Sequence, residues 1–218
     1  MPTYMPLMMD VADRSCVLIG GGRIAERKAI PLLDAGAKVK IISPELSDRL
    51  LNLHQDGVLE WVRRSYREGD LNGAFLAYAV TDDPEVNNAV TTEANALGIP
   101  VNHAGDSGKG SFITPSVLRR GKLVLSVSAS GSGPAAANRL CREINEAYGD
   151  DYEVYFDALA LARTMVKATV QDAERRAALL RAVMEMDLLV QIRDGTYTPW
   201  SEENWRNWIE GYREDDKG

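Results

Sequence analysis

The chain has 218 residues, of which 45% are hydrophobic and 26% are charged, and its formal net charge at pH 7 is −7. This composition is that of an ordinary folded protein with a sizeable core, and it argues against wholesale disorder. The acidic balance argues against nucleic acid as a partner, because proteins that bind nucleic acid usually present a basic face. No apolar stretch approaches the roughly 20 residues of a membrane span, so we expect no membrane partner.

The amino-terminal residues and the cysteines indicate a compartment. Residues 1–14 carry Asp10 and Asp13 and lack a basic leader followed by a long apolar run, so we expect no signal peptide. Cys16 and Cys141 show no metal-type spacing, and we interpret them as reduced packing residues. These features predict a cytoplasmic protein.

Between residues 15 and 102, short apolar runs alternate with amphipathic stretches. This alternation predicts βαβ units, and therefore an α/β fold with a mainly parallel sheet covered on both faces. Pro31 falls inside the first predicted helix, where its missing backbone donor should bend or weaken the turn before it. The predicted strands are 16–19, 39–42, 59–62, 74–80 and 99–102, and the predicted helices are 24–35 and 85–97.

The pattern changes after Asn102. Residues 103–110 are rich in Gly and Ser and predict an exposed loop. Residues 111–114 and 123–128 then predict two more strands, with a turn at 120–122 between them.

The last part of the chain predicts helices only. Residues 130–134 predict a turn, and Pro134 suits the first turn of a helix that runs to about residue 148. From Tyr152 onward the apolar residues follow helical spacing, which predicts two or three helices packed together. We interpret Trp200, Trp205 and Trp208 as members of this small core.

The strongest functional signal is the segment VLIGGGRIAERKA, in which an apolar strand ends at Gly20. Its glycines fit the pattern G-x-G-x-x-G/A between a strand and a helix. Gly20 allows the tight turn, Gly22 lets the backbone approach a pyrophosphate, and Ala25 lets the helix pack closely on the sheet. The alternative is a glycine-rich turn that binds no ligand. The context favours a Rossmann-type dinucleotide-binding domain, whose expected phosphate-binding residues are Gly20, Gly21, Gly22, Arg23 and Ile24.

The second predicted strand ends in Ser43 and Pro44, where proteins of this type normally carry an acid that binds the adenosine ribose. Ser43 offers one hydrogen bond to the ribose, and Glu45 lies just beyond it. Because no Arg or Lys occupies this position, the sequence favours NAD over NADP.

Other polar residues follow the later strands. Thr81, Asp82 and Asn102 lie at the carboxyl ends of their strands, where ligands gather in open parallel sheets. We expect them to form walls of the nicotinamide pocket. For Asp82 and its neighbour Asp83 the alternative is capping of the helix that begins near Pro84.

Three segments in combination resemble the precorrin-2 dehydrogenases of siroheme synthesis: VLIGGGRIAERKA, the strand end VKIISP, and FITPSVLRRGKLVLSVSASGSGP. The resemblance covers nearly the whole chain. It implies a homodimer that uses NAD to oxidise precorrin-2 to sirohydrochlorin. It also implies a Rossmann domain at 1–110, a dimerisation segment at 111–150 and a helical domain at 151–218.

The resemblance further implies a catalytic aspartate in the loop after the 99–102 strand, and Asp106 is the candidate there. Aligned without a gap, Gly105 falls where some members carry that aspartate. His103 is a second candidate for the base that accepts a proton, because histidine titrates near neutrality. The alternatives are a turn-forming role for Asp106 and an ordinary surface position for His103.

A precorrin carries many carboxylates, so an anionic tetrapyrrole substrate calls for basic residues near the pocket. Guanidinium groups bind carboxylates in a bidentate manner. The alternative for each cation is simple solvation at the surface. The expected substrate-binding residues are Arg119, Arg120, Lys122, Arg139 and Ser128.

Two further functions stay open. His54 and His103 are the histidines of the chain and belong to no ligand cluster, so no metal site is predicted. The scaffold is nevertheless compatible with a bifunctional dehydrogenase that also inserts iron or cobalt. A non-catalytic NAD-binding sensor would share the same dinucleotide-binding half.

Overall fold

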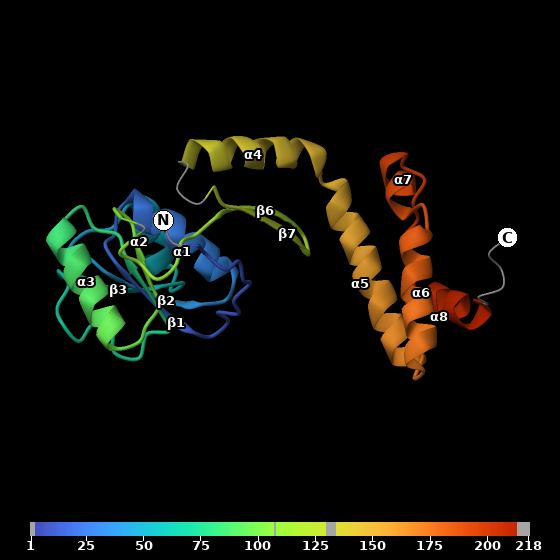
Figure 1. Cartoon of the computed structure of the whole chain (residues 1–218), viewed down its shortest axis with the longest axis horizontal. Coiled ribbons are helices and arrows are strands. Elements are labelled where there is room, and N and C mark those ends of the chain that lie inside the picture. Colours follow the sequence, from blue (N-terminus) through green and yellow to red (C-terminus); the bar gives the residue numbers. More distant parts are fainter. Residues whose placement is uncertain (1–2, 107, 130–133, 213–218) are drawn as a thin grey trace. The chain divides into compact units, whose positions relative to one another are not determined.

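Figure 1 shows the computed structural model of the chain, which describes residues 3–106, 108–129 and 134–212. The chain divides into two compact units, Met1–Thr114 and Pro115–Gly218. Over these described residues, no helix is long and apolar enough to cross a bilayer.

The first unit is built on a five-stranded sheet of order β3-β2-β1-β4-β5. Every neighbouring pair in it is parallel, which confirms the predicted parallel α/β sheet. The strand order reverses between β1 and β4, and in such sheets a ligand crevice lies at the carboxyl ends of the strands at this point. The strands are β1 (Ser15–Ile19), β2 (Lys38–Ile42), β3 (Glu60–Val62), β4 (Leu76–Ala79) and β5 (Val101–His103).

Helices cover both faces of this sheet because side chains alternate along each buried strand. On one face Leu18 and Ile41 pack with α1 (Arg23–Asp34) and α2 (Asp48–Gln55). On the other face Val17 and Ile19 pack with α3 (Pro84–Ala96). Helix α1 continues through Pro31 to Asp34, with Pro31 on its exposed side.

The second unit begins with an antiparallel hairpin of β6 (Ser116–Arg120) and β7 (Leu123–Val127). The strand expected at 111–114 is wrong. Ser111 and Phe112 instead bond to β5, through the Ser111 N–H to Val101 O and the Asn102 amide to Phe112 O. The first hairpin strand starts only beyond Pro115.

Five helices follow the hairpin within the described residues. They are α4 (Pro134–Ala147), α5 (Asp151–Thr169), α6 (Ala173–Glu185), α7 (Leu188–Arg193) and α8 (Glu202–Gly211). Four of these helices, α5 to α8, lie where the sequence predicted two or three. Asp172 and Ser201 cap the starts of α6 and α8, so each of these begins as a separate helix. Trp205 is 1% exposed, and Trp200 and Trp208 pack against its cluster.

Candidate functional site

The turn between β1 and α1 accepts only glycine at its first two positions. Gly20 has φ +119°, and a Cβ there would lie 2.6 Å from the carbonyl oxygen of Val80. A Cβ on Gly21 would collide with the carbonyl oxygen of Glu45. Gly22 differs, because a Cβ built on it would meet nothing within 4 Å. The turn is therefore packed tightly at Gly20 and Gly21 and open at Gly22.

Helix α1 begins at this open position. Gly22 is its N-cap and supplies no side-chain hydrogen bond to the first turn. The N–H groups of that turn have no partner within the helix, and the positive end of the helix dipole adds to them. Ala25 is fully buried against the sheet, as the motif requires. This helix start has the features of a phosphate-binding site.

A cavity of about 600 Å³ lies over the glycine turn. Its walls come from the ends of β1, β2 and β4 and from the start of α1. All of the expected cofactor-binding residues line it except Asn102. The lining residues are Gly20, Gly21, Gly22, Arg23, Ile24, Ser43, Pro44, Glu45, Leu46, Ser47, Val80, Thr81 and Asp82.

The segment after β2 is hydrogen-bonded to the glycine turn and to the first turn of α1. The Ser47 N–H donates to Gly21 O at 2.8 Å, and the Ser47 hydroxyl donates to Glu26 Oε2 at 2.9 Å. Ser43 is buried, and its carbonyl accepts a hydrogen bond from the Trp61 indole at 2.9 Å. Sequence reasoning missed Leu46 and Ser47. The available signal was Ser47 as the N-cap of α2, which that reasoning did not predict.

Thr81, Asp82 and Asp83 divide their roles at the end of β4. Thr81 lines the cavity, and its N–H donates to Asn87 Oδ1 at 3.0 Å. Asp83 caps α3 by accepting the Glu85 N–H at 2.8 Å, so the capping alternative applies to Asp83. Asp82 is exposed and stays at the cavity wall.

The two catalytic candidates lie next to each other after β5. The prediction that His103 lies in an exposed loop is wrong. His103 is the last residue of β5 and is 6% exposed. Its Nδ1 accepts the Asp106 N–H at 3.0 Å, and its Nε2 is buried with no partner among the described residues. Asp106 is exposed, and its carboxylate accepts the Gly108 N–H at 2.9 Å. Neither residue lines the cavity over the glycine turn, and Asn102 ties β5 to Phe112 instead.

The basic residues expected to bind substrate lie in the second unit, and most of them have acidic partners there. Lys122 pairs with Asp157, and Arg139 pairs with Glu143 at 3.0 Å. Arg120 lies 3.1 Å from Asp150, although not aligned as a hydrogen bond, and also donates to Asn145. Arg119 and Ser128 are exposed. Arg119 is therefore the cation of this set without a recorded acidic partner in the described part of the chain.

Cys16 belongs to the core of the first unit and does not line the cavity. Burial raises the pKa of the Cys16 thiol to about 11, so this fully buried group stays protonated and packs in the core. Across the residues that the structure describes, no three His, Cys, Asp or Glu side chains gather where they could hold a metal ion.

Comparisons with known proteins match the first unit and a large part of the chain. Residues 7–116 match the family described as "Putative NAD(P)-binding". The chain is 33% identical over 192 residues to siroheme synthase from Chromobacterium violaceum, covering 88% of this chain and 41% of that protein. It is 40% identical over 144 residues to siroheme synthase 1 from Aeromonas salmonicida, covering 66% of this chain and 31% of that one. The chain thus spans less than half the length of these relatives.

A solved structure has a similar fold over most of the chain. The structure of "SirC, precorrin-2 dehydrogenase" superposes with a TM-score of 0.78 at 24% identity. The match covers 96% of this chain and 100% of that one.

Proposed function

The chain belongs to the NAD(P)-binding family that residues 7–116 match, and from this premise we propose that it is an NAD-dependent precorrin-2 dehydrogenase. The observation that carries the proposal is the open position at Gly22, above the uncapped start of α1, in a cavity of about 600 Å³. Support for the substrate comes from relatives named siroheme synthase and from a fold match named precorrin-2 dehydrogenase.

The residues around the cavity fit a dinucleotide. The N–H groups of the first turn of α1 bind the pyrophosphate, with Arg23 beside them at the cavity wall. Ser43 and Glu45 bind the adenosine ribose, and Thr81 and Asp82 border the nicotinamide end. NAD, when bound, supplies the acceptor for the hydride that leaves precorrin-2 as sirohydrochlorin forms.

For the proton that also leaves the substrate, the favoured acceptor is Asp106. Asp106 is exposed, whereas His103 is buried, with Nε2 enclosed and Nδ1 already accepting a hydrogen bond. For the substrate carboxylates, the favoured cation is Arg119, because Arg120, Lys122 and Arg139 have acidic partners in their own unit. Ser128 is a further substrate contact in this proposal.

The proposal includes a homodimer formed through residues 111–150. Within its own unit, the hairpin of β6 and β7 packs against α4. Apolar side chains of this segment remain open: Val117 is 48% exposed, Leu140 is 47% exposed and Tyr148 is 37% exposed. A second copy of the chain would cover these side chains.

The test is turnover under anaerobic conditions. Purified protein is mixed with NAD and enzymatically generated precorrin-2, and the absorption spectrum is followed. Growth of the NADH band together with the spectrum of sirohydrochlorin is the expected result. NAD binding without any change in either spectrum would overturn the dehydrogenase proposal and favour a sensor.

A further inference from the structure

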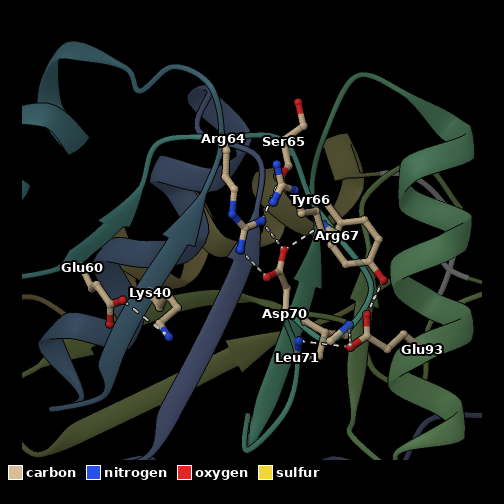
Figure 2. Close-up of polar contacts among 10 residues, drawn as sticks. Lys40, Glu60, Arg64, Ser65, Tyr66, Arg67, Asp70, Leu71 and Glu93 are labelled. Atoms are coloured by element: carbon tan, nitrogen blue, oxygen red, sulfur yellow. Dashed lines mark hydrogen bonds and ion pairs between the residues drawn. The ribbon is translucent and has the colours of Figure 1, made fainter.

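Two consecutive arginines, Arg63 and Arg64, follow β3 and contact different side chains. The Arg64 guanidinium donates two hydrogen bonds to the Asp70 carboxylate, at 2.7 and 2.6 Å. Figure 2 shows this pair inside the loop that leads to β4, close to the contacts of Tyr66 and Leu71 with Glu93. The Arg64 guanidinium is thus used in hydrogen bonds that stabilise the loop between β3 and β4.

Arg63 is exposed and lies on an aromatic ring. Its guanidinium carbon is 5.4 Å from the centroid of Trp61, a cation–π arrangement. No carboxylate partner of Arg63 is recorded within the described ranges, whereas Arg64 is paired with Asp70. Arg63 therefore keeps the donors of its guanidinium group available for an anion.

Trp61 links Arg63 to Ser43, which lines the cavity, whereas Trp61 and Arg63 lie outside the lining. Trp61 pairs with Ile41 in the register of β2 and β3, and its indole N–H donates to the Ser43 carbonyl at 2.9 Å. The Ser43 N–H donates to Val62 O, so Ser43 and Arg63 continue neighbouring strands beyond their carboxyl ends. Because side chains alternate along a strand, Arg63 shares the face of Trp61. The cation thus lies beside the residue expected to bind the adenosine ribose.

The two charged side chains near Ser43, Glu45 and Arg63, are opposite in sign. Glu45 lines the cavity and is exposed, and its carboxylate favours a ribose with a free 2′-hydroxyl. A nearby arginine instead accommodates a 2′-phosphate in this kind of fold, and a guanidinium group matches a phosphate with two parallel hydrogen bonds. Ser43, in the place usually taken by an acid, carries no charge that would repel the phosphate.

We propose that Arg63, supported on Trp61 beside Ser43, binds the 2′-phosphate of NADP and lets the chain accept NADP as well as NAD. The inference rests on the proposed dinucleotide site. The residues that follow the second strand, Ser43, Pro44 and Glu45, include no Arg or Lys, which is why the sequence favours NAD. The relevant cation comes from the neighbouring strand, about 20 residues later in the sequence.

The test compares the binding of NADP and NAD by titration calorimetry, with no substrate present. The variants are Arg63→Gln and the control Arg14→Gln. Arg14 also lies over an aromatic ring, Phe75 at 5.2 Å, but it precedes the central strand β1, at the amino-terminal ends of the strands and opposite the cavity. It therefore matches Arg63 in charge and stacking and lies away from the cavity.

The wild type is expected to bind NADP within about tenfold of NAD. Arg63→Gln should weaken NADP about tenfold and NAD less than about twofold, as expected for the loss of a charge-assisted hydrogen bond. Arg14→Gln should change neither affinity. The NADP effect should shrink as salt rises, because Arg63 is exposed.

The failures are distinguishable. If the wild type binds NAD but Arg63→Gln leaves the ratio of the two affinities unchanged, this inference is wrong and the proposed function stands. NADP binding in the wild type that is more than about a hundredfold weaker than NAD binding would overturn it in the same way. A wild type that binds neither nucleotide would overturn the proposed function and this inference together.

Discussion

The backbone N–H of Asp106 donates a hydrogen bond to Nδ1 of His103 across 3.0 Å. Since Nδ1 acts as an acceptor, the neutral ring carries its proton on Nε2. His103 is 6% exposed, so this hydrogen bond ties the backbone of Asp106 to a buried side chain. Under the proposed function, this arrangement gives His103 the role of a positioning residue for Asp106.

Two substitutions of His103 separate positioning from proton transfer. The amide oxygen of His103→Asn lies near the place of Nδ1, whereas His103→Gln places its amide near Nε2. We expect His103→Asn to retain most of the turnover of precorrin-2 and His103→Gln to lose about fivefold to tenfold, the effect of one hydrogen bond. The measurement is kcat as a function of pH, with thermal melting as a control for folding.

The role of Asp106 is tested in the same assay. Asp106→Asn should lower kcat at least about a hundredfold, the usual contribution of a positioned base. A His103→Asn variant that folds normally but loses turnover, with an altered pH profile, would assign the base to His103 instead.

The glycine turn yields a prediction about neighbouring positions. Gly22→Ala should lose no more than about 1 kcal/mol of unfolding free energy, because alanine is a poorer N-cap than glycine but the φ of Gly22 is −84° and an added Cβ meets nothing within 4 Å. It should bind NAD at least about tenfold more weakly, since the methyl group lies where the pyrophosphate approaches. Gly21→Ala should lower the free energy of unfolding by about 1–3 kcal/mol or more, because the added Cβ collides with the backbone carbonyl oxygen of Glu45. Denaturant unfolding and calorimetry measure both effects. Equal NAD affinity in Gly22→Ala and the wild type would contradict the phosphate site.

These contrasts show what the sequence could predict. The turn at Gly20 was predictable because motif, strand and helix are contiguous, so local spacing defines the geometry. The helix α2 was not, since it has eight residues and buries only Leu50. The contact of Trp61 with Ser43 was also hidden, because it depends on which strand pairs with β2. The burial of His103 depends on packing around the end of β5, which its Gly-rich flanking sequence does not reveal.

Acid stability should depend on Asp70. The hydrogen bonds from Arg64 hold the pKa of Asp70 below its ordinary value. A lowered folded pKa means that Asp70 stabilises the fold above the unfolded pKa of about 3.9, and that this contribution is lost as pH falls through the folded pKa. The unfolding free energy of the wild type should therefore exceed that of Asp70→Asn at neutral pH. The difference should shrink below about pH 4. A difference that stays constant with pH would assign the effect to packing alone.

The proposed dimer is tested with two leucines of equal exposure. Leu140 in α4 and Leu97 at the end of α3 are each 47% exposed. Leu140→Glu should shift the protein toward a monomer, because it places a charge in the proposed interface. Leu97→Glu should leave the assembly unchanged. Light scattering after gel filtration measures the mass. Dissociation by both variants, or by neither, would contradict an interface at residues 111–150.

The most direct test of the account joins the cofactor site to the reaction. NADH and sirohydrochlorin are quantified together in anaerobic reactions of the wild type and Gly22→Ala with precorrin-2 and limiting NAD. We expect one NADH for each sirohydrochlorin in the wild type, with the rate falling in Gly22→Ala in parallel with its loss of NAD affinity. Sirohydrochlorin that forms without NADH, or at the same rate in Gly22→Ala at low NAD, would contradict a dehydrogenase built on the glycine turn.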